Sequence, residues 1–472
     1  MAIVTHGNKF NYYEINRTKK QIRDIKMANL AVSNAARKSK GSKKNLANPP
    51  FEDILIAFDA SAKPSGTIKD YYLAEAALFH IPGAIEFGYG QSRTWDADCL
   101  LNKRLNSQII KYSLARIKLA AYCVQINSNR SYQMKQFYKY IESSDKATIS
   151  FILGGVFSYL SALHWVESDN DFIEHFLHAS NLAISSLQLE KKNSRKTPDY
   201  IVSSVGKKWH VFESKGGTII KRWMRIEEGL RQLGIVTHIS WDENTATSVN
   251  TEVCTHACID ASNEIDVAVV DPIYDKRSDL KINKTVAFLM EKIICLDLFE
   301  FFSRGGQVKK IEDKSKWIFT QSTDFDGLEF AIPEDYLNNK DTLRKRLAIY
   351  ITIRDVLKNL RGTNRAHVKN HMKSDIEDSL KSYPDELTKA LELDLDSILN
   401  KTFEGALLEI TEQLGLKELA LELKKCDDML KIELSNAALK CRSTSGMLSG
   451  KNISSPDFWN GVKRTGRPKP TF

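Results

Sequence analysis

The chain has 472 residues, which is too long for one ordinary core and favours two to four domains. Hydrophobic residues make up 42% and charged residues 27% of it, a balance that excludes a disordered chain and indicates a folded protein. The formal net charge of +9 weakly favours a polyanionic partner such as nucleic acid.

We expect residues 1–145 to form an N-terminal domain, either α/β or mainly helical. The opening sequence MAIVTHGNKFNYYEINRTKK lacks the apolar segment of a secretory signal, and seven scattered cysteines suggest no disulfide framework, so we expect a cytoplasmic protein. The run ARKSKGSKKN at 36–45 holds five cations and no acid, which is typical of a solvated linker or of an arm that contacts phosphates. Apolar residues at helical spacing predict a helix over 108–126.

The pattern changes in residues 146–300, where helices are expected first at 147–166 and 171–190. The first of these carries no formal charge and is long enough to span a bilayer. Its hydroxyl residues, two glycines and His164 favour a buried core helix over a membrane span. A further helix at 219–233 and the strand-like runs GIVTHIS and IDVAVVDP complete the region.

Between these helices, the stretch TPDYIVSSVGKKWHVFESKGG predicts a β-hairpin. Two β-rich segments are joined there by Gly206-Lys207. Asp199 stands at the start of the first strand, and Glu213 and Lys215 stand near the end of the second. Because side chains alternate along a strand, Glu213 and Lys215 are expected on the same face.

These residue types suit metal-dependent hydrolysis of a phosphodiester. A hard cation such as Mg²⁺, or alternatively Mn²⁺, takes oxygen ligands, and two carboxylates held at a fixed distance supply them. The metal stabilises charge on the scissile phosphate and acidifies a bound water. A lysine beside the metal can orient or deprotonate that water.

Pro198-Asp199 followed by Glu213-Ser214-Lys215, within β-rich segments and before a helix, resembles the PD-(D/E)xK, or restriction-endonuclease-like, nuclease superfamily. The resemblance implies a core of a helix, a meander of strands, a second helix and a further strand. It also implies that Asp199 and Glu213 bind the metal and that Lys215 is catalytic. The alternative is an ion-paired structural hairpin, which includes the inactive members of that superfamily.

The resemblance extends with less support to two further site residues. Members often carry a glutamate on the helix before the hairpin, for which Glu174 is the candidate and Glu190 the rival. Many also carry a polar residue on the helix after the Glu-x-Lys strand, and Gln232 fits that place. The alternative for both is a solvated residue on a helix surface.

The segment CTHAC, with Cys254, His256 and Cys258, invites a zinc interpretation. Structural zinc needs a second ligand pair at proper spacing, and none is nearby. The segment alternates like a strand, so packing in the core is favoured. No acyl-transfer signature and no phosphate loop is present.

Residues 344–373 carry nine cations and one acid, a net charge of +8 (nine minus one). The cations at 354, 358, 361, 365, 369 and 373 are three or four residues apart and would form one stripe on a continuous helix. We predict that this basic stripe holds a nucleic-acid backbone, through these residues above all: Arg354, Lys358, Arg361, Arg365 and Lys369. A face neutralised by the acidic residues of 375–433 is the alternative, and Gly362 is a point where the helix could break.

The sequence therefore predicts an α/β protein in three parts. A restriction-endonuclease-like core, a mixed sheet flanked by helices, occupies 146–300, after the N-terminal α/β or helical region. A mainly helical region follows at 301–472, with a short strand-like patch at KWIFTQS and a basic tail. The expected activity is that of a Mg²⁺-dependent endonuclease that acts on DNA, in a restriction, mobile-element or anti-phage defence setting. We expect no association with a membrane. The protein could act as a homo-oligomer or with a partner subunit. An inactive nucleic-acid-binding or assembly protein and an RNA-directed nuclease are the alternatives.

Overall fold

The computed structural model describes most of the chain between Trp95 and Leu434, with further short segments. The described residues are 8–15, 63–70, 95–126, 132–168, 171, 173–188, 198–233, 236, 238–242, 245–260, 264–271, 279–303, 308–310, 317–321, 328–358, 365–381, 393–434, 442–444 and 447–451. The basic run at 36–45, Glu190, Arg361 and the C-terminal tail lie outside these residues.

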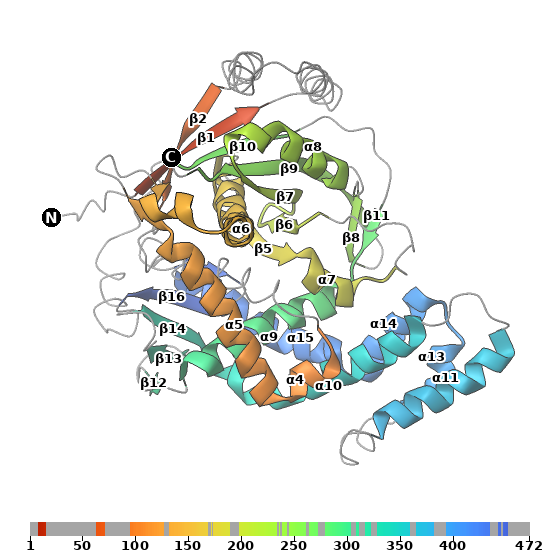
Figure 1. Cartoon of the computed structure of the whole chain (residues 1–472). Coiled ribbons are helices and arrows are strands. Elements are labelled where there is room, and N and C mark those ends of the chain that lie inside the picture. Colours follow the sequence, from red (N-terminus) through yellow and green to blue (C-terminus); the bar gives the residue numbers. More distant parts are fainter. Residues whose placement is uncertain are drawn as a thin grey trace.

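A mixed β-sheet is the centre of the molecule (Figure 1). Seven strands follow the order β2-β1-β10-β9-β7-β6-β5, and β8 with β11 branches from β9. Three neighbouring pairs are parallel, namely β1 with β10, β7 with β9, and β11 with β8. The strand bounds are β1 (Asn8–Ile15), β2 (Lys63–Asp70), β5 (Ile173–His178), β6 (Tyr200–Ser204), β7 (Trp209–Gly217), β8 (His238–Asp242), β9 (Thr245–Cys258), β10 (Asp266–Val270) and β11 (Asp279–Lys281). The expected α/β class, with a mixed sheet flanked by helices, is confirmed.

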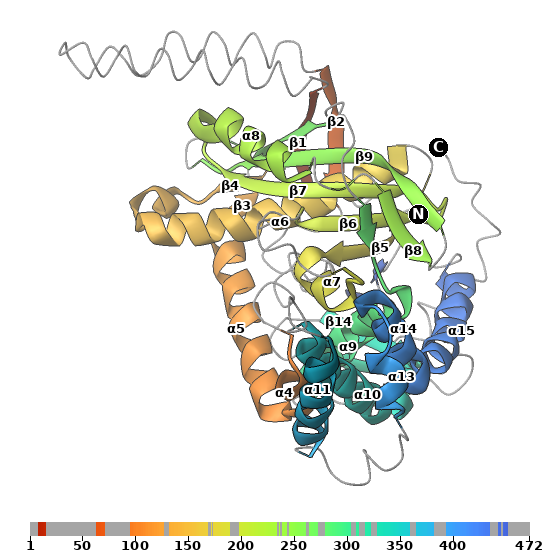
Figure 2. The same cartoon turned by 90° about the vertical axis from the view of Figure 1, so that its right-hand side faces the viewer.

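Helices cover both faces of this sheet. Helix α6 (Ser143–Ser168) lies on one face and α8 (Arg222–Leu233), which follows the short 3₁₀ helix η2 (Ile219–Lys221), lies on the other (Figure 2). Alternate residues of β7 belong to the two apolar layers, with Phe212 on the α6 side and Val211 on the α8 side. Because both faces of the sheet are covered, all of β6 and the first five residues of β7 are buried.

The contact between α6 and β7 is unusually close because glycines face each other there. A Cβ placed on Gly216 would overlap the carbonyl oxygen of Ser150, and one placed on Gly154 would lie 3.0 Å from the amide nitrogen of Gly216. Only residues without a side chain permit this approach. Helix α6 confirms the prediction of a buried helix at 147–166. Its residues Ile149, Leu153 and Phe157 are fully buried in the core.

The N-terminal part joins the same sheet. Strand β1 pairs with β10 and β2 pairs with β1, so residues expected in separate domains share one sheet. The helix expected at 108–126 is present as far as Tyr122, and the last residues of that range, Val124–Ile126, form a strand. The elements before α6 are α4 (Ala97–Leu101), α5 (Lys103–Tyr122), β3 (Val124–Ile126), β4 (Tyr132–Met134) and the 3₁₀ helix η1 (Gln136–Tyr140).

The helix expected over 171–190 is wrong in its first half. Residues Ile173–His178 form β5, which pairs antiparallel with β6, and only Ala179–Ser185 form a helix, α7. Pairing with a buried neighbouring strand outweighs the local helical spacing, because propensity is a weak prior against tertiary contacts.

The C-terminal part is helical with a second sheet, which the expectation of a mainly helical region missed except at KWIFTQS. Its helices are α9 (Lys284–Ser303), α10 (Glu334–Lys358), α11 (Arg365–Leu380), α13 (Leu395–Leu399), α14 (Phe403–Gln413) and α15 (Leu416–Leu434). The second sheet has the order β12-β13-β14-β16-β15, formed by β12 (Val308–Lys310), β13 (Trp317–Gln321), β14 (Leu328–Pro333), β15 (Arg442–Thr444) and β16 (Met447–Lys451). One apolar core runs from α5 and α6 through α9 to α10 and α15.

The membrane alternative finds no support in the described part of the chain. No helix there combines the length and the hydropathy needed to cross a bilayer.

Substituting Gly216→Ala should destabilise the protein, because α6 must move away from β7 to admit the methyl group. Overpacking of this kind costs about 1–3 kcal/mol, which urea unfolding would measure. Gly405→Ala in α14 is the matched control, because the nearest atoms to its added methyl are flexible side-chain atoms of Lys401 and Thr402. An equal, small effect of both substitutions would contradict the close contact.

Candidate active site

The predicted hairpin is present as β6 and β7. Its register pairs Tyr200 with Phe212 and Ser203 with Trp209. The turn contains Lys207 in the left-handed region, with φ of 61°. The hairpin therefore begins and ends where the sequence indicated, and its open end carries the candidate residues.

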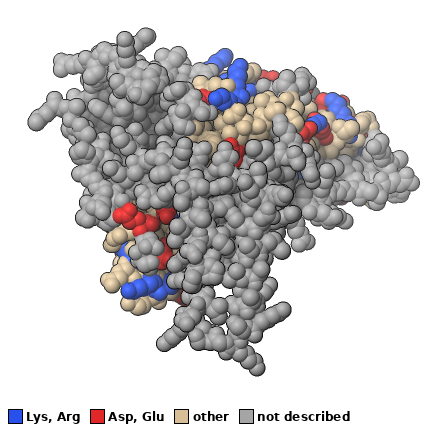
Figure 3. Space-filling model, turned by 90° about the horizontal axis from the view of Figure 1, so that it is seen from above, with Lys and Arg blue, Asp and Glu red and all other residues tan. Residues whose placement is uncertain are grey.

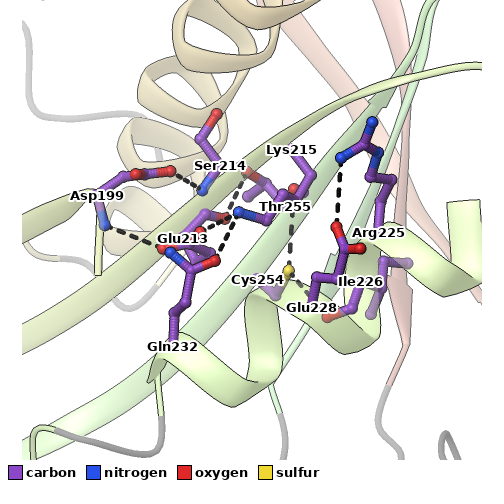
Figure 4. Close-up of polar contacts among 10 residues, drawn as sticks. All are labelled: Asp199, Glu213, Ser214, Lys215, Arg225, Ile226, Glu228, Gln232, Cys254 and Thr255. Atoms are coloured by element: carbon purple, nitrogen blue, oxygen red, sulfur yellow. Dashed lines mark hydrogen bonds and ion pairs between the residues drawn. The ribbon is translucent and has the colours of Figure 1, made fainter. Parts of the chain in front are cut away.

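Asp199 and Glu213 are neighbours at that open end. The register that pairs Tyr200 with Phe212 places Asp199 beside Glu213 on the adjacent strand. Two hydrogen bonds join them: the Asp199 amide donates to Glu213 Oε2 at 3.1 Å, and the Ser214 amide donates to Asp199 Oδ2 at 2.9 Å (Figure 4). Each carboxylate is thus held by the backbone of the other strand.

Lys215 and Gln232 complete a connected cluster. The Lys215 ammonium forms an ion pair with Glu213 Oε1 and donates a second hydrogen bond to Gln232 Oε1 at 2.9 Å (Figure 4). Gln232 comes from the last turn of α8, the helix after the Glu-x-Lys strand. The structure therefore brings together four of the five predicted catalytic residues.

The cluster lies between the sheet and α8. A Cβ on Gly229 of α8 would lie 3.0 Å from Glu213 Cγ and 3.4 Å from Lys215 Cε, so a glycine is required for the helix to approach these side chains. Glu213 is fully buried, whereas the Lys215 side chain is 17% exposed. The lysine is thus the side of the Glu213–Lys215 pair that water reaches.

Burial dominates the protonation of this cluster. Burial and the neighbouring Asp199 carboxylate raise the pKa of Glu213 to about 8, even though Lys215 attracts its anion. Burial likewise raises the pKa of Asp199, against the pull of Lys215 and the Ser214 amide. For Lys215, burial lowers the pKa, but attraction to Glu213 and Asp199 outweighs it and leaves the pKa above its ordinary value. The lysine is therefore an ammonium ion at neutral pH.

The prediction that Glu174 lies on the helix before the hairpin is wrong. This residue lies on strand β5, where the pairing register with β6 shifts between Ile173 and His175. Those two residues pair with Ser204 and Ser203, at the turn end of the hairpin. Asp199 lies at the other end of β6, so four to five residues, or about 15 Å, separate the two places along the strand.

The basic stripe is also corrected. Helix α10 ends at Lys358 and α11 begins at Arg365, so the cations do not share one helix. Arg354 is buried; its guanidinium donates to the carbonyl oxygen of Ala183 and pairs with Asp355 at 3.2 Å. Lys358 pairs with the same aspartate at 3.4 Å. The Arg354 hydrogen bond ties α10 to α7, whereas the Lys358 pair lies within α10. The side chains of Arg365 and Lys369 lie outside the described residues.

Sequence reasoning did not connect His256 with the site. His256 lies on β9, in register with Lys215, and is fully buried. Neither of its ring nitrogens has a hydrogen-bond partner among the described residues. Burial and the Arg222 guanidinium keep its pKa well below the ordinary value, so the ring is neutral. Strand alternation in CTHAC indicates that the residue is buried, but the parallel pairing of β9 with β7, which places it beside Lys215, has no signal in the sequence.

Core packing of the CTHAC segment is borne out, since Cys254, His256 and Cys258 are buried on β9. The described residues contain no group of three or more His, Cys, Asp or Glu side chains arranged to hold a metal ion.

Comparison with family models, with curated proteins and with solved structures finds no match to this chain.

The raised pKa of Glu213 predicts a pH-dependent stability. A group whose pKa is higher in the folded protein stabilises it below the unfolded pKa, and this stabilisation is lost as pH rises from about 4.5 to about 8. The free energy of unfolding of the wild type, measured with urea in EDTA, should therefore fall over this range relative to Glu213→Gln. Glu422→Gln on α15 is the control and should parallel the wild type. Parallel curves for Glu213→Gln and the wild type would contradict the raised pKa.

Proposed function

We propose that this protein is a metal-dependent endonuclease that hydrolyses phosphodiester bonds, with DNA as the first substrate to test. The observation that carries the proposal is the convergence of Asp199, Glu213, Lys215 and Gln232 at the open end of one hairpin. Four residues selected from sequence by a single chemical hypothesis form one hydrogen-bonded cluster. An unrelated surface hairpin would have no reason to bury its glutamate beside a second carboxylate, against the cost of desolvation.

A restriction-endonuclease-like core is part of the same proposal. Helix α6, the antiparallel strands β5, β6 and β7, helix α8, and β9 parallel to β7 follow one another in the order of that superfamily's helix, strand meander, helix and strand. Helix α7 is inserted between β5 and β6, and β8 between α8 and β9. Gln232 on the helix after the Glu-x-Lys strand fits as well. These features support the assignment through their order and position.

The donor set suits Mg²⁺ or Mn²⁺. Asp199 and Glu213 would hold the ion through carboxylate oxygens, which hard cations prefer, and Mg²⁺ commonly uses only one or two protein carboxylates together with water and substrate phosphate. With both carboxylates ionised and Lys215 protonated, the buried cluster would carry a net charge of −1. Burial raises the pKa of both acids, and the Asp199 carboxylate raises the pKa of Glu213 further. A divalent cation would offset that charge. When bound, it would stabilise charge on the scissile phosphate and acidify a water.

Lys215 would orient the attacking water or a phosphate oxygen. Its pKa is raised, so its ammonium group donates hydrogen bonds and does not accept a proton at neutral pH. Gln232 fixes the ammonium from the α8 side, and Glu213 fixes it from its own strand. Of the two roles expected for this lysine, orientation fits its protonation better than proton abstraction.

The inactive nucleic-acid-binding or assembly protein remains the second candidate function. The observation in its favour is the direct Glu213–Lys215 ion pair, in which the two groups satisfy each other. An RNA-directed nuclease would use the same residues on a different substrate. Cleavage assays separate the three.

Purified protein is predicted to cut a nucleic acid in Mg²⁺ or Mn²⁺ and to lose this activity in EDTA. Plasmid, single-stranded DNA and RNA form the substrate panel. Glu213→Gln and Lys215→Met should each reduce the cleavage rate on the order of 10²-fold or more. Glu422→Gln and Lys424→Met, in the Glu-x-Lys sequence of α15, are matched controls and should leave the rate unchanged.

Each outcome has a distinct meaning. Cutting of RNA alone supports the RNA-directed nuclease, and binding without cutting of any substrate supports the inactive fold. Undiminished cutting by Glu213→Gln and Lys215→Met would refute the assigned site.

Gln232→Leu is predicted to slow cleavage less than Lys215→Met does, by about 10-fold, because it removes one of two hydrogen bonds that hold the ammonium. Gln232→Glu should preserve the acceptor oxygen and retain more of the rate than the leucine variant. Equal loss in both variants would show that Gln232 does not act through Lys215.

The described part of the face seen from above carries Lys and Arg side chains close to Asp and Glu side chains, without a continuous basic field (Figure 3). On α8 itself, Arg222 is buried and paired with Asp266, and Arg225 pairs with Glu228 at 3.3 Å. Both arginines of α8 whose side chains the structure describes are therefore paired with an acid.

A further inference from the structure

The most one-sided charge in the described structure lies on α5 and the segments that follow it. From Lys103 to Ile141 the sequence has eight cations and no acid: Lys103, Arg104, Lys111, Arg116, Lys118, Arg130, Lys135 and Lys139. Five of them belong to α5. In contrast to Arg354, the lysines at 111, 118 and 139 are exposed.

Exposed aromatic rings are interleaved with these cations. Tyr112, Tyr122 and Tyr140 are 59%, 62% and 77% exposed. A cation lies over each ring: Arg116 at 5.7 Å from the centroid of Tyr112, Lys135 at 4.4 Å from Tyr122, and Lys139 at 4.9 Å from Tyr140. Single exposed apolar residues are common on protein surfaces, but three exposed aromatic rings, each beside a cation, indicate a binding surface.

The surface is presented by a rigid element. Ile110, Leu114, Ile117 and Ala121 of α5 recur at helical spacing and are buried in the main core. The residues Tyr112, Tyr122, Lys111 and Lys118 occupy the remaining sides of α5. The exposure of the two tyrosines is therefore fixed by the packing of α5. We call the set formed by Tyr112, Tyr122, Tyr140 and their neighbouring cations the aromatic–basic surface.

One end of this surface is fixed to α6. Tyr138 of η1, next to Lys139 and Tyr140, shares a hydrogen bond with the Ser150 hydroxyl at 3.2 Å. The carbonyl oxygen of Ser150 packs directly against Gly216, on the face of β7 opposite the one that carries Glu213 and Lys215. The surface is therefore connected to β7 through α6, from the face away from the candidate active site.

We infer that the aromatic–basic surface binds single-stranded nucleic acid, with bases stacked on Tyr112, Tyr122 and Tyr140 and phosphates bound by the adjacent lysines. Flat, exposed rings can stack on unpaired bases, whereas paired bases of a duplex have no free face to offer them. The cations supply the attraction to the backbone. The inference rests on the proposed function for the identity of the polymer, and it does not depend on catalysis.

The test measures binding by fluorescence anisotropy, with full-length protein carrying Glu213→Gln in EDTA so that nothing is cut. The probes are labelled single-stranded DNA, single-stranded RNA and duplex DNA of equal length. Each of Tyr112→Ala, Tyr122→Ala and Tyr140→Ala should weaken binding of the single strand about 10-fold. The matching Tyr→Phe variants keep the ring and should retain the affinity, which controls for folding.

Lysine variants test the electrostatic part. Lys118→Gln and Lys139→Gln should each weaken binding and reduce the dependence of the affinity on salt. Lys424→Gln, an exposed lysine of α15, is the control and should bind as the parent does.

Several outcomes would overturn the inference. Tight binding that all three Tyr→Ala variants retain would place the nucleic acid elsewhere, while the proposed cleavage site would stand. Equal losses for duplex and single strand would refute the single-strand preference. Binding to anionic lipid vesicles but to no nucleic acid would refute this partner, and the cleavage assay would then decide the proposed function separately.

Discussion

The burial of the Glu213 carboxylate between β7 and α8 is the constraint on which the candidate site depends. An acid in such a place has to be neutralised by a proton, by a neighbouring cation or by a metal ion. Here Lys215 lies two residues away on the same face, and the Asp199 amide donates the remaining hydrogen bond. A second carboxylate beside the first makes the neutralisation incomplete, and this incompleteness is the chemical reason to expect a cation as ligand.

Two glycine contacts on opposite faces of β7 set the position of that carboxylate. Gly229 lets α8 descend onto Glu213 and Lys215, and Gly216 lets α6 approach the strand from behind. Because the strand is confined from both sides, small movements of either helix would change the distance between the carboxylates. The layered packing and the chemistry of the site are therefore coupled through a few positions without side chains.

The sequence was informative where local pattern and tertiary role agree. The hairpin, its turn at Gly206-Lys207 and the shared face of Glu213 and Lys215 follow from alternation and turn chemistry alone. Gln232 followed from a family resemblance at one helical position. The prediction that Glu174 lies on a helix failed because it relied on the helical spacing of nearby apolar residues. The pairing of this segment with β6 makes it a strand instead.

Strand neighbours far apart in sequence could not be predicted, and they supply much of the site's environment. His256 became a neighbour of Lys215 only through the parallel pairing of β7 with β9. The strands of the N-terminal part and of the second sheet likewise find partners that no local signal names. Long-range pairing of this kind depends on the whole fold, so residue spacing carries little information about it.

The two groups of cations show why charge in a sequence does not locate a binding surface. On α10 the net charge of the segment is high, yet Arg344 is buried against Asp297 and Glu300 of α9, and Arg354 against a backbone carbonyl. The acids that pair with Arg344 come from another helix, so the segment's own sequence does not reveal that pairing. On α5 no acid follows for almost forty residues, and aromatic rings stand exposed among the lysines. A stretch of cations is available to a polyanion when the fold buries its apolar side and leaves its charges exposed. Both helices bury their apolar side, but Lys111 and Lys118 of α5 are exposed, whereas Arg344 and Arg354 of α10 are buried.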